Sequence, residues 1–179
     1  MKKIVLLIAL IALPLIGFSQ STFDRFEDMD EVSTVVVNQN MFKLFSRIES
    51  DDPEAQEFME MVKSLNDLKV FITEDKGVGE DMKSAVEKYL KKASLQELMR
   101  VKDKDVNVKF YIKQGRDEDH VSELLMFVTG LKDVEANGRK FETVLLSLTG
   151  DIDLNKISTL TKKMNLPSEL EKVDKKNKI

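Results

Sequence analysis

Cysteine and tryptophan are absent from the sequence, and histidine occurs only once. Without cysteine the chain forms no disulfide and cannot be acylated as a lipoprotein. A single histidine without cysteine cannot build a typical zinc site, which needs several nitrogen or sulfur ligands. Only three prolines and seven glycines occur among 179 residues, and no repeat or low-complexity linker separates two parts of the chain. The sequence therefore predicts one domain that folds without disulfides or structural zinc.

The first twenty residues follow the pattern of a secretory signal. Two lysines give a positive start, residues 4–16 form an uncharged apolar run, and small residues come next. The run is shorter than the roughly 20 residues that span a bilayer, so we expect a cleaved signal and no retained membrane anchor. The small side chains predict cleavage between Ser19 and Gln20. The chain is therefore expected to be exported and soluble, in the periplasm or outside the cell.

The remaining chain is mildly acidic. Removing the signal takes away two of the 28 basic residues and none of the 32 acidic ones, which changes the net charge from −4 to −6. Such a chain is poorly suited to nucleic acid or anionic membrane surfaces. Charged residues make up 34% and hydrophobic residues 42%, which is typical of a globular domain. We expect this domain over residues 21–171 and a flexible basic tail over residues 172–179.

Two apolar stretches, residues 122–131 and 141–150, predict the centre of the fold. In both, large apolar side chains occupy the odd and the even positions. A strand that is apolar on both faces belongs in the middle of a sheet that is covered above and below. We expect a helix after them over residues 154–164, opened by Asp151 and Asp153.

The other elements predict an α+β fold with a single, mostly antiparallel sheet of about six strands and helices on one face. Further strands are expected at 31–38, 68–73, 95–102 and 105–114, because these stretches are β-branched or alternate in polarity. Asn40 is expected to cap a helix whose apolar positions recur at helical spacing. These positions are Met41, Leu44, Phe45 and Ile48. Two further helices are expected after Asp51 and after residue 79.

Several motifs imitate functional sites but are incomplete. The patterns beginning at Asp103 and Asp151 resemble the start of a calcium loop, but they lack the glycine and the glutamate that such a loop requires. We interpret the first as a hairpin turn and the second as a helix cap. Gly77-Val78-Gly79 lacks the Gly-Lys-Ser/Thr ending of a phosphate-binding loop and is interpreted as a turn before a helix. His120 has no partner that would suggest a triad, so we expect it to face solvent at the start of a strand.

Four passages of the chain resemble a known family. These are residues 35–44 (VVVNQNMFKL), 98–103 (LMRVKD), 122–125 (SELL) and 146–154 (LSLTGDIDL). Together with the signal, they resemble the exported bacterial proteins classified as domain of unknown function 4252. The resemblance covers nearly the whole exported chain, and its passages are structural. It implies no activity and no catalytic residues, but it implies an envelope or stress-related role.

The leading hypothesis is a non-enzymatic envelope protein that acts through contacts with an unidentified envelope protein, in envelope stress signalling. No cofactor, metal or nucleic acid is expected. The candidate contact surface is the helix pair from Met41 to Leu65, with its methionine and phenylalanine side chains and with Phe42 and Met59 singled out, or an exposed sheet face with Tyr111. The alternative is a carrier of a small molecule or lipid, with a pocket between sheet and helices. Met82, Met126 and Phe127 would line that pocket. A hydrolase that uses only carboxylates is the third hypothesis.

Overall fold

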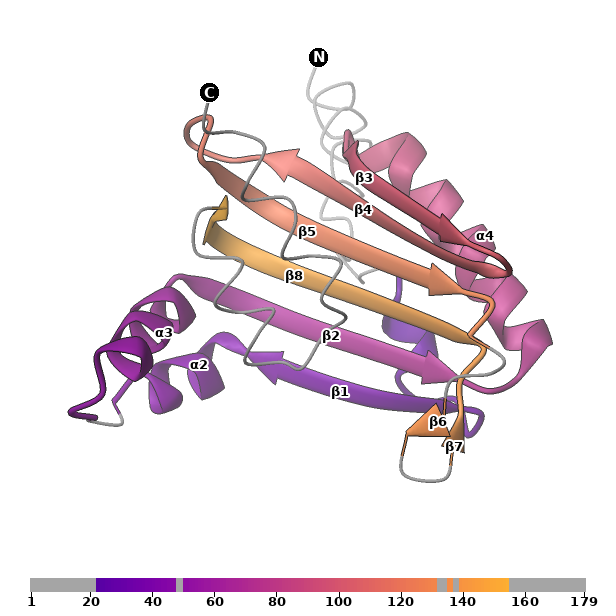
Figure 1. Cartoon of the computed structure of the whole chain (residues 1–179), viewed down its shortest axis with the longest axis horizontal. Helices are drawn as coiled ribbons and strands as arrows, with labels where there is room; N and C mark the ends of the chain where they lie inside the picture. Colours follow the sequence, from indigo (N-terminus) through magenta and orange to yellow (C-terminus); the bar gives the residue numbers. More distant parts are fainter. Residues whose placement is uncertain (1–21, 48–49, 132–134, 137–138, 155–179) are drawn as a thin grey trace, which may run out of the picture.

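The computed structural model of the chain describes residues 22–47, 50–131, 135–136 and 139–154 (Figure 1). The signal segment with its cleavage site after Ser19, residues 155–164 of the expected last helix, and the tail at 172–179 lie outside the described residues.

Six antiparallel strands form the main sheet, in the order β1-β2-β8-β5-β4-β3. A separate pair of two-residue strands, β6 and β7, forms a second sheet. The predicted α+β fold with one antiparallel sheet is confirmed. The elements in chain order are η1 (Asp24–Phe26), β1 (Val32–Asn38), α2 (Gln39–Phe45), α3 (Pro53–Lys63), β2 (Leu65–Thr73), α4 (Lys76–Ala93), β3 (Gln96–Asp103), β4 (Val106–Gln114), β5 (His120–Thr129), β6 (Glu135–Ala136), β7 (Arg139–Lys140) and β8 (Thr143–Asp153).

β5 and β8 lie at the centre of the main sheet, as their two apolar faces predict (Figure 1). Leu125 is fully buried on one face, whereas the neighbouring Met126 lies opposite Leu146 and is buried on the other. Because adjacent residues of a strand point to opposite faces, each central strand contributes to two separate apolar clusters. The sheet therefore has a core on both of its sides.

The helix α4 packs on one face together with η1. Asp75 caps α4, and its Oδ1 accepts a hydrogen bond from the backbone N–H of Val78 at 2.8 Å. Met82 is fully buried against this face. At Gly79 the helix approaches the sheet so closely that a Cβ atom would lie 2.6 Å from Oγ1 of Thr143. The glycines that we expected in a loop therefore belong to the first turn of α4, where the helix meets the sheet.

The opposite face carries the second apolar cluster. Its buried members include Phe110, Met126 and Leu146 from three neighbouring strands. α2 adds Phe42 and α3 adds Val62 to the same cluster. Helices therefore contribute to both faces, whereas we had expected them on one.

Local structure differs from expectation at two places. β8 continues to Asp153, so Asp151 and Asp153 lie in a strand, and residues 155–164 of the helix that they were expected to open lie outside the described residues. Asn38, and not Asn40, caps α2, because its Oδ1 accepts the hydrogen bond from the N–H of Met41 at 3.1 Å. The expected turn after Asp103 is confirmed, since Lys104 adopts the left-handed conformation with φ of 50° between β3 and β4.

Candidate functional site

Exposed apolar side chains gather on β1 and α2. Among the described residues, six large apolar side chains are exposed, and five of them lie on these two consecutive elements. They are Val35 and Val36 on β1 and Met41, Leu44 and Phe45 on α2. The sixth, Leu98, lies on β3 at the opposite edge of the sheet. Scattered apolar residues are normal on a protein surface, whereas a cluster of this kind marks a site of interaction.

The orientation of α2 explains why its apolar stripe faces outward. The helix has seven residues, and Phe42 is its one buried residue. Phe42 is 5% exposed, whereas Leu44 is 58% exposed. Residues 41, 44 and 45 point in other directions from the helix axis than residue 42 does. When Phe42 packs against the sheet, these three side chains therefore face solvent. We call Met41, Leu44 and Phe45 the α2 stripe.

β1 is an outer strand of the sheet (Figure 1). It pairs with β2 over all seven residues without a register shift, and none of these residues is charged. Val35 lies opposite Val70 and Val36 lies opposite Lys69, so these two exposed valines point to different faces of the sheet. The outer edge of β1 therefore offers an uncharged backbone with an apolar side chain on either side.

Lys69 forms two ion pairs behind this edge. Its Nζ donates to Oδ1 of Asp24 and to Oε1 of Glu27, the latter at 2.6 Å. Burial alone would lower the pKa of Lys69, but the two carboxylates outweigh it and raise that pKa above its ordinary value. The Lys69 side chain is only 14% exposed and its ammonium group stays charged, so it fixes the loop before β1 to β2.

Charges of opposite sign lie at the two ends of β1. Before the strand, Asp28, Asp30 and Glu31 are exposed. After it, Lys43 and Arg47 are exposed, and residues 39–47 contain no acid. The edge is therefore negative at its start and positive past its end.

The α2 stripe belongs to the expected helix pair from Met41 to Leu65, but the residues singled out as the contact surface are not part of the stripe. Phe42 and Tyr111 are 5% and 9% exposed, so neither presents a surface, and the expectation of an exposed sheet face at Tyr111 is wrong. Phe42 is the anchor of α2, and Tyr111 belongs to the cluster under α4. Met59 is half-buried and lines a depression between α2 and α3. The helical spacing of the α2 stripe was visible in the sequence, but its outward direction was not.

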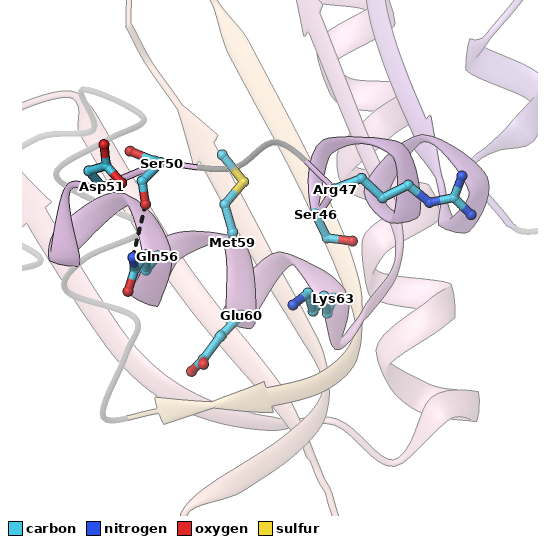
Figure 2. Close-up of a pocket in the computed structure, with 8 residues that line it drawn as sticks. All are labelled: Ser46, Arg47, Ser50, Asp51, Gln56, Met59, Glu60 and Lys63. Atoms are coloured by element: carbon cyan, nitrogen blue, oxygen red, sulfur yellow. Dashed lines mark hydrogen bonds between the residues drawn. The ribbon is translucent and has the colours of Figure 1, made fainter.

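The depression beside Met59 has a volume of about 890 Å³ and mixed charge (Figure 2). Arg47 and Lys63 are balanced by Asp51 and Glu60. Figure 2 shows the side chains of Arg47 and Glu60 extending in different directions instead of converging on one point. Its charges favour neither an anion nor a cation, so it adds no ligand site to the apolar surface beside it.

His120 is largely buried, with 16% of its side chain exposed, so the solvent-facing position that we expected is wrong. Its Nδ1 lies 2.6 Å from Oδ1 of Asp117 and its Nε2 lies 2.6 Å from Nη2 of Arg116. Because arginine only donates hydrogen bonds, Nε2 is the acceptor and Nδ1 carries the proton that it donates to Asp117. The hydrogen bond from His120 lowers the pKa of Asp117. Both ring nitrogens are thus engaged in holding the loop before β5.

A buried carboxyl group lies under α4. Glu123 is 5% exposed, and its Oε2 accepts a hydrogen bond from the Tyr89 hydroxyl at 2.9 Å. Its Oε1 has no hydrogen-bond partner among the residues that the structure describes. Burial raises the pKa of Glu123, although the Tyr89 hydroxyl and Lys113 act against this. The pKa of Tyr89 is also raised, mainly by burial and to a smaller extent by Glu123. The protonated form is therefore favoured more than in an exposed glutamate, and the contribution of this group to stability is lost as the pH rises from the ordinary value through the higher folded value.

The residues of the expected carrier pocket do not share one space. Met82 and Phe127 point into the face under α4, where Met82 is packed within a filled apolar cluster. Met126 belongs to the cluster on the opposite face of the sheet. The three side chains therefore cannot line a common pocket.

The described part of the chain contains no group of three or more histidine, aspartate or glutamate side chains that could hold a metal ion. None of its helices is both long enough and apolar enough to span a membrane.

Comparison with known proteins gives one match. The model of the family described as "Domain of unknown function (DUF4252)" matches residues 26–160. No curated protein and no solved structure matches the chain.

Proposed function

The chain belongs to the family of domain of unknown function 4252, and from this premise we propose that it is an exported, non-enzymatic protein of the cell envelope. It acts by binding another envelope protein through the α2 stripe, and envelope stress signalling is the process that this contact serves. The family brings no activity with it, so the proposal is argued from the chain's own surface.

The α2 stripe is the observation that carries this proposal. Three large apolar side chains, 40–58% exposed, stand on a helix that the buried Phe42 holds in place. Fully burying such a side chain is worth roughly 1.5–3 kcal/mol, and because each is already about half-buried, a partner can add about half of that per side chain. Lys43 and Arg47 are the exposed charges nearest to it in sequence, so the partner's groove is expected to be apolar with an acidic rim.

The chemistry of the polar clusters supports a non-enzymatic role. Both nitrogens of His120 already have hydrogen-bond partners, Asp117 and Arg116, so neither is directed at a substrate. Glu123 is enclosed beneath α4 with Tyr89 and is not open to a substrate. The groups best placed for acid–base chemistry thus have structural roles.

Site-specific photo-crosslinking in intact cells tests the contact. A photoreactive residue at Leu44 is expected to capture one reproducible envelope protein. The matched control is the same residue at Leu98, which is similarly exposed but lies on the opposite edge. Capture from Leu44 is expected to disappear in a Phe45→Asp background, whereas Leu98→Asp leaves it intact. Equal capture from both positions, or none from Leu44, would contradict the proposal.

Export is tested separately by the intact mass of the protein recovered from the periplasm or medium. The expected chain begins at Gln20. A chain that retains Met1 in the cytoplasm would overturn the envelope assignment without bearing on the contact surface.

A further inference from the structure

We propose that β1 pairs in antiparallel fashion with β1 of a second copy of this chain, with Val35 of one copy opposite Val35 of the other. The two six-stranded sheets then form one continuous sheet across a twofold axis. This inference goes beyond the proposed function, because it uses the strand edge of β1 and leaves the α2 stripe for another protein.

The β1 edge lacks the features by which proteins prevent strand addition. Outer strands are commonly protected by charged side chains, bulges or proline. β1 has no charged residue and no proline, and its register with β2 is unbroken. The opposite edge is protected. β3 has a register shift between Glu97 and Met99, and its exposed positions carry Glu97, Arg100, Lys102 and Asp103.

Strand addition at β1 would bury the side chains that are now exposed. Val35 is 52% and Val36 is 45% exposed although both lie in the middle of a strand. They point to opposite faces, so a strand added beside them would contact both. Val35 is the middle residue of the seven, and a twofold axis at this position pairs the whole strand with its copy.

The charges at the ends of β1 indicate that the strand added beside it comes from a second copy of this chain. At roughly 3.3 Å per residue, Glu31 lies about 13 Å to one side of Val35, and α2 begins about the same distance to the other side. Antiparallel pairing therefore brings Asp30 and Glu31 of each copy to the start of α2 of the other, the basic helix that carries Lys43. Parallel pairing would place acids beside acids. The chain thus supplies both halves of a complementary edge, as a twofold interface requires.

The absence of cysteine makes the pairing directly testable by disulfide formation. Residues directly opposite in an antiparallel pair have Cα atoms about 4.5–5.5 Å apart, which a disulfide can bridge. Val35→Cys is expected to form a disulfide-linked dimer under mild oxidation. The matched control is Arg100→Cys, an exposed position in the middle of the other edge. It is expected to stay monomeric under the same conditions.

The register gives a second, sharper readout. With Val35 on the axis, residue 33 of one copy lies opposite residue 37 of the other. Ser33→Cys and Val37→Cys are each expected to remain monomeric alone, and to form a mixed disulfide when combined. The two proteins, distinguished by mass tags, are mixed and oxidised.

The charge complementarity between the two ends of β1 is tested with charge-reversal variants that contain no cysteine. Asp30→Lys with Glu31→Lys makes one variant basic at both ends of β1, and Lys43→Glu with Arg47→Glu makes another acidic at both ends. Sedimentation velocity is expected to show at least tenfold weaker self-association for each variant alone. An equimolar mixture is expected to recover the dimer. Circular dichroism checks that each variant is folded.

Two results would overturn the pairing. One is a wild-type protein that sediments as a monomer at 100 µM. The other is disulfide formation that is as efficient at Arg100→Cys as at Val35→Cys. Neither result affects the photo-crosslinking at Leu44, so failure of the strand pairing and failure of the α2 contact can be distinguished.

Discussion

The two edges of the sheet differ in charge and in regularity, two of the features that control strand addition. β3 is interrupted by a register shift and carries four exposed charged side chains, whereas β1 is regular, uncharged and apolar at its centre. Both edges belong to the same sheet and face the same solvent. Since the chain protects one edge in this way, the lack of protection on the other indicates an edge that is used.

The edges also differ in how they are supported. On β3, the ion pair between Arg100 and Glu97 is exposed and links side chains of one strand. Behind β1, Lys69 is largely buried and joins β2 to the loop before β1. β1 is followed at once by α2, which is anchored by Phe42. The edge without protection is therefore held firmly in position.

The largest effect is expected when the anchor of α2 is removed. Phe42→Ala should lower the free energy of unfolding by about 3–5 kcal/mol, because it empties a buried aromatic site. Leu98→Ala on the opposite edge should change it by less than about 0.5 kcal/mol, since that side chain is exposed. Urea denaturation measures both. Equal losses would show that the two edges are supported alike.

The next largest loss of stability is expected when an ion pair is removed. Lys69→Met leaves two carboxylates without their ammonium and should cost roughly 1–3 kcal/mol. Arg100→Met should cost much less, and its effect should vanish in high salt, because the pair is exposed. The variants are compared by urea denaturation with and without added salt.

The pH dependence sharpens this comparison. The pKa of Lys69 is raised by its carboxylate partners above 10.5. Its stabilising contribution is therefore fully present below the ordinary value and is lost as the pH rises through the higher folded value. The stability difference between wild type and Lys69→Met should stay constant from neutral pH to about pH 10. A difference that already declines near neutral pH would contradict the ion-pair assignment.

A lysine in the middle of β1 should make this edge resemble β3. Val35→Lys should change the free energy of unfolding by no more than about 0.5 kcal/mol, because the side chain stays exposed. The same change should abolish self-association in sedimentation velocity, since a charge would be buried opposite its copy. If Val35→Lys unfolded the protein as well as abolishing self-association, the loss of association would not support pairing through β1.

The converse change on β3 should have the smallest effect. Glu97→Val with Arg100→Val removes two charges from that edge, but the register shift after Glu97 remains. Self-association through β3 should therefore rise only slightly. It is measured by adding Lys102→Cys to this variant and following the formation of a disulfide-linked dimer. Association as strong as at β1 would mean that charge alone protects an edge.

The centre of the fold could be predicted from the sequence, whereas its edges could not. β5 and β8 have apolar residues at odd and even positions, and this local pattern requires cover on both faces. The position of β1 depends on its pairing with β2, which lies beyond two helices in the chain. Its valines would suit a central strand equally well.

The candidate surface was predicted only in part, for a related reason. The expected helix pair from Met41 to Leu65 includes the α2 stripe, but the residues singled out on it were Phe42 and Met59. The spacing of Met41, Leu44 and Phe45 is helical, but spacing does not determine which side of a helix meets the sheet. Tyr111 alternates with apolar residues along β4, which correctly places it on the face opposite Phe110. That face is covered there by the cluster beneath α4, a contact between distant parts of the chain that no local pattern of β4 reveals.

The position of β8 has a consequence for how the chain reaches its native state. β8 is the last described strand in the sequence, yet it lies between β2 and β5. Until residues 143–153 have been synthesised, β1 and β2 on one side and β3, β4 and β5 on the other share no strand pairing within the described sheet. Contacts between residues far apart in sequence form slowly, because closing a long loop costs entropy before the contacts are made. The nascent chain thus cannot complete its sheet until residues 143–153 have been synthesised, which would suit the unfolded state that the proposed export across a membrane requires.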